Sequence, residues 1–268
     1  MVFDMTSSLS ALNSLSKLLE LQEDVIQSFI DENIEYDGVC IESTFTADGL
    51  LDKAGLTSDS LDITNITLMI LHYTSTNDNC QTLKTLGIRD LQYVLANKTP
   101  LSNFLSAKGV TFDIRNNIMV AFGKNYDIKY CIKRSQDDAL KDISRKVYYD
   151  YATSAFFFID DVTKYSGRVH TRPEFLVDLE SFDSRLNGIS DEWANKNKKY
   201  EIKIAAPLSI LDDCVWKTDG FVKWLIRCAL PIAGHITDCS FAHIKRGSHV
   251  DPHHIVGIRE ISAGNADT

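Results

Sequence analysis

The feature that most constrains the fold is an unbroken apolar run at residues 68–71, which leads directly into His-Tyr-Thr-Ser-Thr at 72–76. An apolar run without polar alternation is typical of a strand that is buried on both faces. A short helical pattern follows and closes at Gly87. A buried strand that ends in an imidazole and hydroxyl groups presents polar side chains at the mouth of a cleft. We therefore predict that residues 66–89 form the floor of a ligand site.

The N-terminal pattern predicts a helical extension. Apolar residues at three- and four-residue steps predict a helix over 7–33, and a connector at 36–65 contains a possible strand at 39–45. We expect the apolar stripe of this helix to pack on the core, although it can also dock on a partner. The chain then has an N-terminal helix and connector at 1–60 and a larger α+β domain at 61–268.

Strands and helices follow one another irregularly along the larger domain. The expected strands cover 67–73, 110–114, 118–122, 156–159, 200–206, 240–244 and 255–261. The expected helices cover 80–86, 88–96, 101–108, 135–149, a segment from Arg172-Pro173 past Trp193, and part of 211–230, which Pro231 should end. Since this order lacks the regular βα rhythm of a parallel sheet, we expect antiparallel strands with inserted helices, an α+β fold.

Charge and cysteine usage limit the function classes. The net charge of -9 argues against a general polyanion-binding surface, whereas several Lys and Arg at 124–146 leave a local nucleic-acid groove open. Six scattered cysteines without a CxxC pair are typical of a reducing cytoplasmic location. The N-terminus lacks the basic segment of a signal peptide, and no uncharged apolar stretch reaches about 18 residues, so we expect no membrane span.

Two short segments together resemble the ADP-ribosyltransferases of the diphtheria-toxin and poly(ADP-ribose) polymerase type. The first is His-Tyr-Thr at 72–74, at a strand end, with a helix and Gly-Ile at 87–88 after it. The second is Phe-Phe-Ile-Asp-Asp-Val-Thr-Lys at 157–164, which is similar to the polymerases' Tyr-Phe-Ala-Asp-Met-Val-Ser-Lys segment with phenylalanine in place of the first tyrosine. The resemblance implies a split antiparallel β-sheet core of this family's type and NAD as a substrate.

The resemblance implies NAD-binding roles for His72, Tyr73, Thr74, Phe157 and Tyr165, and it places His72 among the catalytic residues as well. The side chains of His72 and Thr74 are of types that hydrogen-bond the two riboses or a phosphate. The rings of Phe157 and Tyr165 are expected to stack on nicotinamide. The alternative interpretation, from spacing alone, is that His72 is a hydrogen-bonded histidine at a strand end and that the phenylalanine residues belong to the core.

A carboxylate is expected beside His72, because transfer from NAD passes through an oxocarbenium-like centre. The family's glutamate lies on a late strand, which favours Glu260. Glu174 is the competitor, because Glu-Phe-Leu-Val is similar to a segment near the glutamate of some DNA-modifying members. Glu174 follows the aromatic strand too closely for the family's usual order. Either residue can instead be a surface glutamate.

A second cluster, Cys239, His243, His249, His253 and His254, lies close to the C-terminal end. Thiolate and neutral imidazole are zinc ligands. The spacing C-x3-H-x5-H-x3-H matches no strong zinc signature, so no metal ligand is assigned, and a zinc-binding protein is kept as an alternative.

The expected function is mono-ADP-ribosyl transfer from NAD to a macromolecule, nucleic acid (RNA or DNA) before protein, as in toxin and phage-defence members of the family. A cognate inhibitor or antitoxin is then an expected partner, and the leucine-rich N-terminal region is one place where it would bind. The alternative from another class is a non-catalytic interaction protein that has lost the activity of this pocket.

Overall fold

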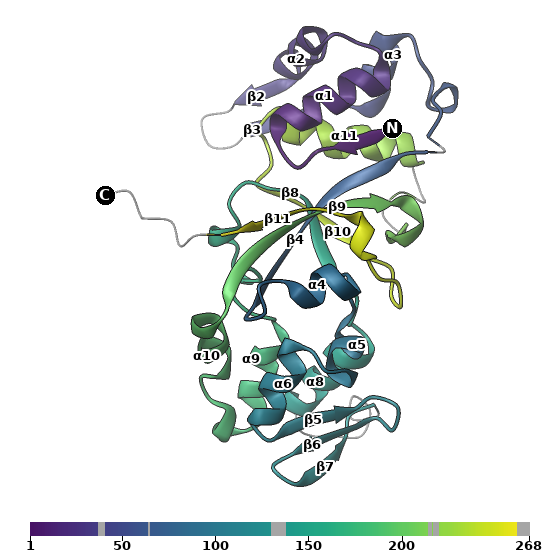
Figure 1. Ribbon diagram of the computed structural model, residues 1–268. Helices are drawn as coiled ribbons and strands as arrows, with labels where there is room; N and C mark the ends of the chain where they lie inside the picture. Colours follow the sequence, from purple (N-terminus) through teal and green to yellow (C-terminus); the bar gives the residue numbers. More distant parts are fainter. Residues whose placement is uncertain (37–40, 64, 130–137, 214–215, 217–219, 262–268) are drawn as a thin grey trace. The chain divides into compact units, whose positions relative to one another are not determined.

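The structure is a computed structural model that describes the chain except for residues 37–40, 64, 130–137, 214–215, 217–219 and 262–268 (Figure 1). The chain forms two compact units, each made of three segments. Unit 1 comprises Met1–Leu71, Ser154–Asp161 and Ile204–His243, and unit 2 comprises His72–Thr153, Val162–Lys203 and Ile244–Thr268. The predicted domain boundary near residue 60 stays a prediction.

Helices dominate the first and last segments of unit 1. They are α1 (Ser8–Leu19), α2 (Glu23–Glu32), α3 (Ala47–Ala54) and α11 (Phe221–Ala233). The helix expected over 7–33 is two helices, because Glu20 takes a left-handed conformation with a φ of 53° and ends α1. Pro231, which we expected to end a helix, lies inside the last turn of α11. The helix α1 packs on α11, whose apolar face is buried.

The largest sheet in the described part of the chain has six strands and confirms the α+β class. Its strands are β1 (Val2–Asp4), β4 (Thr67–Thr76), β8 (Ser154–Ile159), β9 (Lys198–Pro207), β10 (Cys239–His243) and β11 (Ile255–Glu260). The strand order is β10-β8-β4-β9-β11, and β1 pairs with β4. The pairs β10–β8 and β4–β8 are antiparallel. The strand β1, which the sequence pattern did not predict, runs parallel to β4.

The strands β4 and β9 each contribute residues to both units, because the unit boundaries fall after Leu71 and after Lys203. In unit 1 a separate hairpin joins β2 (Ile34–Tyr36) to β3 (Ile41–Ser43). The strand predicted over 39–45 therefore falls in part on β3, and its first two positions lie outside the described residues.

Unit 2 has its own apolar core. Its helices are α4 (Gln81–Leu86), α5 (Leu91–Ala96), α6 (Pro100–Ala107), α8 (Asp138–Tyr148), α9 (Phe175–Phe182) and α10 (Ile189–Lys196). A three-stranded antiparallel sheet of β5 (Val110–Asp113), β6 (Ile118–Ala121) and β7 (Lys124–Asp127) joins them (Figure 1). Leu105 of α6, Met119 of β6 and Trp193 of α10 belong to one buried cluster. The helix expected from Arg172 past Trp193 is divided into α9 and α10.

Short 3-10 helices complete the described chain: η1 (Ser58–Ser60), η2 (Val162–Lys164), η3 (Ser184–Leu186), η4 (Leu208–Ile210) and η5 (Pro252–His254). Among the described residues, no helix has the length and apolar character needed to cross a membrane. Cys80, Cys228 and Cys239 carry free thiols, whereas Cys40, Cys131 and Cys214 lie outside the described residues.

Candidate functional site

The strand β4 carries the predicted His72, Tyr73 and Thr74 in unit 2, and it extends to Thr76. Burial alternates along this end of the strand, with Tyr73 and Ser75 buried and with His72 and Thr74 half-buried. Because successive side chains of a strand point to opposite faces, His72 and Thr74 share one face of β4. Tyr73 and Ser75 occupy the other face.

Ser75 fixes the end of β4 against the core of unit 2. Its hydroxyl donates to the Thr171 carbonyl at 2.7 Å and accepts a hydrogen bond from the Trp193 indole NH at 2.7 Å. Trp193 is itself fully packed, with the ring of Phe104 edge-on to it at a centroid distance of 5.1 Å. A buried hydroxyl with a donor and an acceptor partner holds the backbone in one position. The position of the neighbouring Thr74 is therefore set by the core.

A polar network that the sequence did not reveal lies on the Tyr73 face of the sheet. The Tyr73 hydroxyl donates to Glu201 Oε2 of β9 at 3.0 Å. Arg259 of β11 binds the same carboxylate through two nitrogens, at 3.1 Å from Nε to Oε1 and 2.8 Å from Nη2 to Oε2. Burial, then the Glu201 charge, raise the pKa of Tyr73 well above its ordinary value. Tyr73 therefore remains a hydrogen-bond donor at neutral pH.

Glu260 lies on the opposite face of β11 from Arg259 and forms an ion pair with Lys198 of β9 at 3.0 Å. Both side chains of this pair are about half exposed. Arg259 lies with Glu201 on the Tyr73 face, so the alternation of side chains puts Glu260 on the face of His72 and Thr74. The strand β9 separates β4 from β11 in the sheet.

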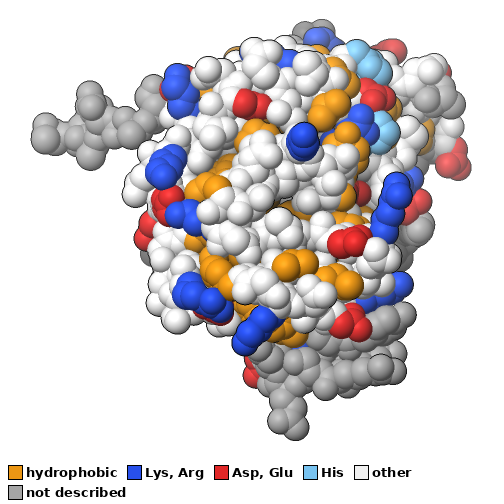
Figure 2. Space-filling model, turned by 60° about the horizontal axis from the view of Figure 1, so that its bottom comes forward, with side chains coloured by type: hydrophobic (Ala, Val, Ile, Leu, Met, Phe, Trp, Pro, Cys, Tyr) orange, Lys and Arg blue, Asp and Glu red, His pale blue; other side chains and the backbone are white. Residues whose placement is uncertain are grey.

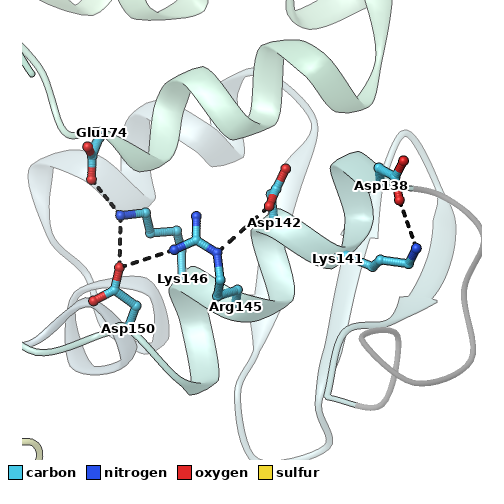
Figure 3. A network of polar contacts seen from close by, with 7 residues as sticks. All are labelled: Asp138, Lys141, Asp142, Arg145, Lys146, Asp150 and Glu174. Carbon is cyan, nitrogen blue, oxygen red and sulfur yellow. Dashed lines mark hydrogen bonds and ion pairs between the residues drawn. The ribbon is translucent and has the colours of Figure 1, made fainter.

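Glu174 is part of a surface network of opposite charges at α8 and α9 (Figure 3). Its carboxylate accepts from the Lys146 ammonium, which also binds Asp150 at 3.0 Å. Burial alone would lower the pKa of Lys146, but the bonds with Glu174 and Asp150 outweigh it and raise that pKa. The Lys146 ammonium therefore holds the Glu174 carboxylate at the N-terminus of α9. Arg145 and Asp142 extend the same network along α8.

The two predicted stacking residues fall in different units. Phe157 of β8 belongs to unit 1, is 2% exposed, and has the Trp224 ring edge-on at a centroid distance of 5.3 Å. Its present surroundings are those of a core side chain. Tyr165 follows η2 in unit 2 and is half-buried, with its ring against Gly167. The nicotinamide-stacking role of both rings stays a prediction.

The turn between β4 and α4 has a fixed shape. Asn79 and Cys80 both have positive φ, and the Asp78 carboxylate accepts from the Thr82 backbone NH at 2.8 Å and the Thr76 hydroxyl at 2.8 Å. Burial raises the pKa of the Cys80 thiol to about 11, and the Asp78 charge adds to this shift. Cys80 is therefore a neutral thiol at pH 7, which argues against a thiolate nucleophile at this turn.

The C-terminal histidines are divided between the units. Cys239 and His243 lie on β10 in unit 1, whereas His249, His253 and His254 lie in unit 2. In unit 2, ligand atoms of Asp251, His253 and His254 lie within 4.8 Å of one another. Asp251 was not part of the predicted cluster, which contained cysteine and histidine residues alone.

Charges of both signs lie on the face of the molecule that Figure 2 draws. Figure 2 shows Lys and Arg side chains interspersed with Asp and Glu over the visible face, with hydrophobic side chains in narrow strips between them. In the stretch 124–146, Lys141 pairs with Asp138 at 2.7 Å, and the network of Figure 3 neutralises Arg145 and Lys146. Residues 130–137 of that stretch lie outside the described residues. Among the described ones, these three cations are paired with carboxylates.

A scan against models of protein families, a search of curated proteins and a search of solved structures each found no match for this chain. The site is therefore characterised by its own geometry alone. His72 and Thr74 of β4 share one sheet face with Glu260 of β11, and the other face carries Tyr73 with its Glu201 partner on β9.

Proposed function

We propose that this protein is a mono-ADP-ribosyltransferase that transfers ADP-ribose from NAD to a macromolecule. In this proposal the side chains of His72 and Thr74 bind NAD from their shared face of β4, and Glu260 is the catalytic carboxylate. The NAD-binding role of Tyr73 and the stacking of Phe157 and Tyr165 on nicotinamide are included on the family resemblance alone. Within the α+β class, the proposal also assigns the fold to the split antiparallel sheet of the ADP-ribosyltransferase type.

The observation that carries the proposal is the shared sheet face of His72, Thr74 and Glu260. This face meets the chemical need for hydroxyl- and phosphate-binding groups on one strand and an acid on a nearby strand. Glu174 lies at the N-terminus of α9, outside the sheet that carries His72, so Glu260 is the better catalytic assignment. On the opposite face, the hydrogen bond from Tyr73 to Glu201 ties β4 to β9.

The proposed reaction breaks the bond between the nicotinamide nitrogen and the ribose C1′ and forms a bond from C1′ to the acceptor. Nicotinamide leaves with the bonding electron pair, and the ribose develops positive charge. A carboxylate near C1′ stabilises that charge and then takes the proton of the acceptor group. We assign both tasks to Glu260, which would have to exchange its bond to Lys198 for the substrate.

We propose nucleic acid as the first target class and protein as the second, by analogy with toxin and defence members of the resembled family. The paired cations of α8 and the interspersed charges of Figure 2 fit a local contact with the target better than a long phosphate-tracking surface. An inhibitor or antitoxin is the partner that such an activity would require in its host.

The test is incubation of the purified chain with NAD labelled in the adenylate phosphate, together with total RNA, DNA and protein from cells. We expect label in one fraction, and we expect Glu260→Gln to lower the rate by about 100-fold or more, as for loss of a general acid or base. Glu174→Gln is the matched control and should keep the wild-type rate. Loss of activity in Glu174→Gln with an active Glu260→Gln would reverse the assignment.

A non-catalytic interaction protein is the second candidate. It is favoured by the ion pairs that already occupy Glu260 and Glu174 and by the core position of Phe157. Absence of label in every fraction, together with absence of NAD binding by calorimetry, would reject the transferase and leave this candidate.

A further inference from the structure

Two backbone hydrogen bonds at Val250 join the loop that precedes β11 to the rest of unit 2. The Ile88 NH donates to the Val250 carbonyl at 2.9 Å, and the Val250 NH donates to the Ile88 carbonyl at 3.0 Å. Val250 is fully buried, although its neighbours His249 and Asp251 are substantially exposed. The loop therefore presents the side chains that follow Val250 from a fixed backbone.

Three side chains after this anchor meet at the 3-10 helix η5. The Asp251 carboxylate and ring nitrogens of His253 and His254 lie within 4.8 Å of one another. The two imidazole rings have a centroid distance of 3.9 Å. Ligands bound at about 2.0–2.1 Å in a tetrahedral site lie roughly 3.4 Å apart, so modest side-chain rotations bring these groups onto one ion.

A fourth side chain orients the carboxylate. The His249 Nε2 atom lies 2.9 Å from Asp251 Oδ1, which leaves Oδ2 of Asp251 for another partner. Hydrogen bonds from neighbouring groups to ligating carboxylates are a recurrent feature of metal sites, and their loss typically weakens metal binding 10- to 100-fold. The cluster therefore has both a candidate set of ligands and a group that supports one of them.

We propose that Asp251, His253 and His254 form a site for one divalent transition-metal ion, and Zn²⁺ fits these ligands best. The bound ion stabilises the loop at the start of β11. Two imidazoles and one carboxylate suit zinc and similar borderline ions, whereas Ca²⁺ and Mg²⁺ prefer oxygen ligands throughout. Water completes the coordination, since His253 is exposed and the other two ligands are half-buried.

The site is separate from the proposed transfer chemistry. Glu260 lies six residues beyond His254 on β11, which corresponds to roughly 20 Å along an extended strand. The ion is therefore too far along the strand to act on the ribose bond. Its role is to hold the loop, and metal binding can fail or succeed independently of NAD chemistry.

The test uses the whole chain of residues 1–268, without a tag, after dialysis against a chelator. Titration with ZnCl₂ by calorimetry should show one strong equivalent, and Co²⁺ should produce the visible absorption of a nitrogen- and oxygen-ligated ion. We expect His253→Gln and His254→Gln each to weaken binding at least 10-fold, and His249→Gln to weaken it about 10-fold. His243→Gln, at an exposed histidine of β10 in unit 1, is the matched control and should bind like the wild type.

His253 is exposed, so His253→Gln tests the ligand set without threatening the fold, and circular dichroism verifies this. Binding of no Zn²⁺ by the wild type would overturn the proposal. Wild-type affinity in both His253→Gln and His254→Gln would overturn it as well, because the ion would then lie elsewhere. Loss of binding only in these variants and in His249→Gln would support it, whatever the result of the NAD assay.

Discussion

Asp78 is the residue whose ionisation should be most visible in the stability of unit 2. Its burial opposes ionisation, but hydrogen bonds from Thr82 and Thr76 outweigh this and lower its pKa below the ordinary 3.8. A lowered pKa in the folded state means that the carboxylate stabilises the fold above the unfolded pKa and loses this effect as pH falls through the folded pKa. We expect Asp78→Ala to destabilise the chain by about 1 kcal/mol at pH 7. The difference from the wild type should shrink as the pH is lowered below 3.8. Urea unfolding across this range measures it, and the exposed Asp59→Ala serves as a control with little effect. A difference that stays constant with pH would contradict the assigned ionisation.

At the residue scale, the sequence predicted the residues of β4 but missed their partners. Tyr73 and Glu201 are 128 positions apart, and only the strand order brings their side chains together.

Gly87 controls the packing of an element, the turn that leaves α4. Its φ of 74° and ψ of −163° lie in a region that essentially only glycine adopts. A Cβ atom there would lie 1.9 Å from the Val250 carbonyl oxygen, which accepts the Ile88 hydrogen bond. We expect Gly87→Ala to lower the free energy of unfolding by about 3 kcal/mol or more, from backbone strain plus the displaced bridge. Gly55→Ala is the matched control, because Gly55 has a φ of 67° and no atom within 4 Å of the added methyl. It should cost about 1 kcal/mol. Equal losses in the two variants, measured by urea unfolding, would show that contact with Val250 is unimportant.

The sequence predicted an end of the helix at Gly87 but not the contact of this turn with Val250. It also gave no sign of the break between α1 and α2, since a glutamate rather than a glycine takes the left-handed position.

At the scale of the whole molecule, the segment 1–60 is an integral part of unit 1. The helices α1 and α3 pack on α11, which buries residues such as Trp224, Leu225 and Ile226. We expect a chain that begins at residue 61 to aggregate or lose helical structure, because this apolar face of α11 would become exposed. Size-exclusion chromatography and circular dichroism of the truncated chain test this expectation. A monodisperse, folded chain of residues 61–268 would instead support the domain boundary predicted from the sequence.

The sequence predicted the α+β class because the periodicity of each element is local. It did not indicate unit 1, because segments separated by long stretches of chain form that unit, and periodicity carries no information on which segments meet.

The composition of unit 1 from separated segments has a consequence for synthesis on the ribosome. The partner of α1 is α11, whose residues emerge long after the N-terminal helices do. At about 5–20 residues per second, synthesis of the stretch from Leu19, the end of α1, to Ala233, the end of α11, takes roughly 10 to 45 s. During that interval the part of the apolar face of α1 that packs on α11 is exposed in the growing chain. Nascent-chain binding by a chaperone should therefore begin with the N-terminal helices and end only after α11 has left the ribosome.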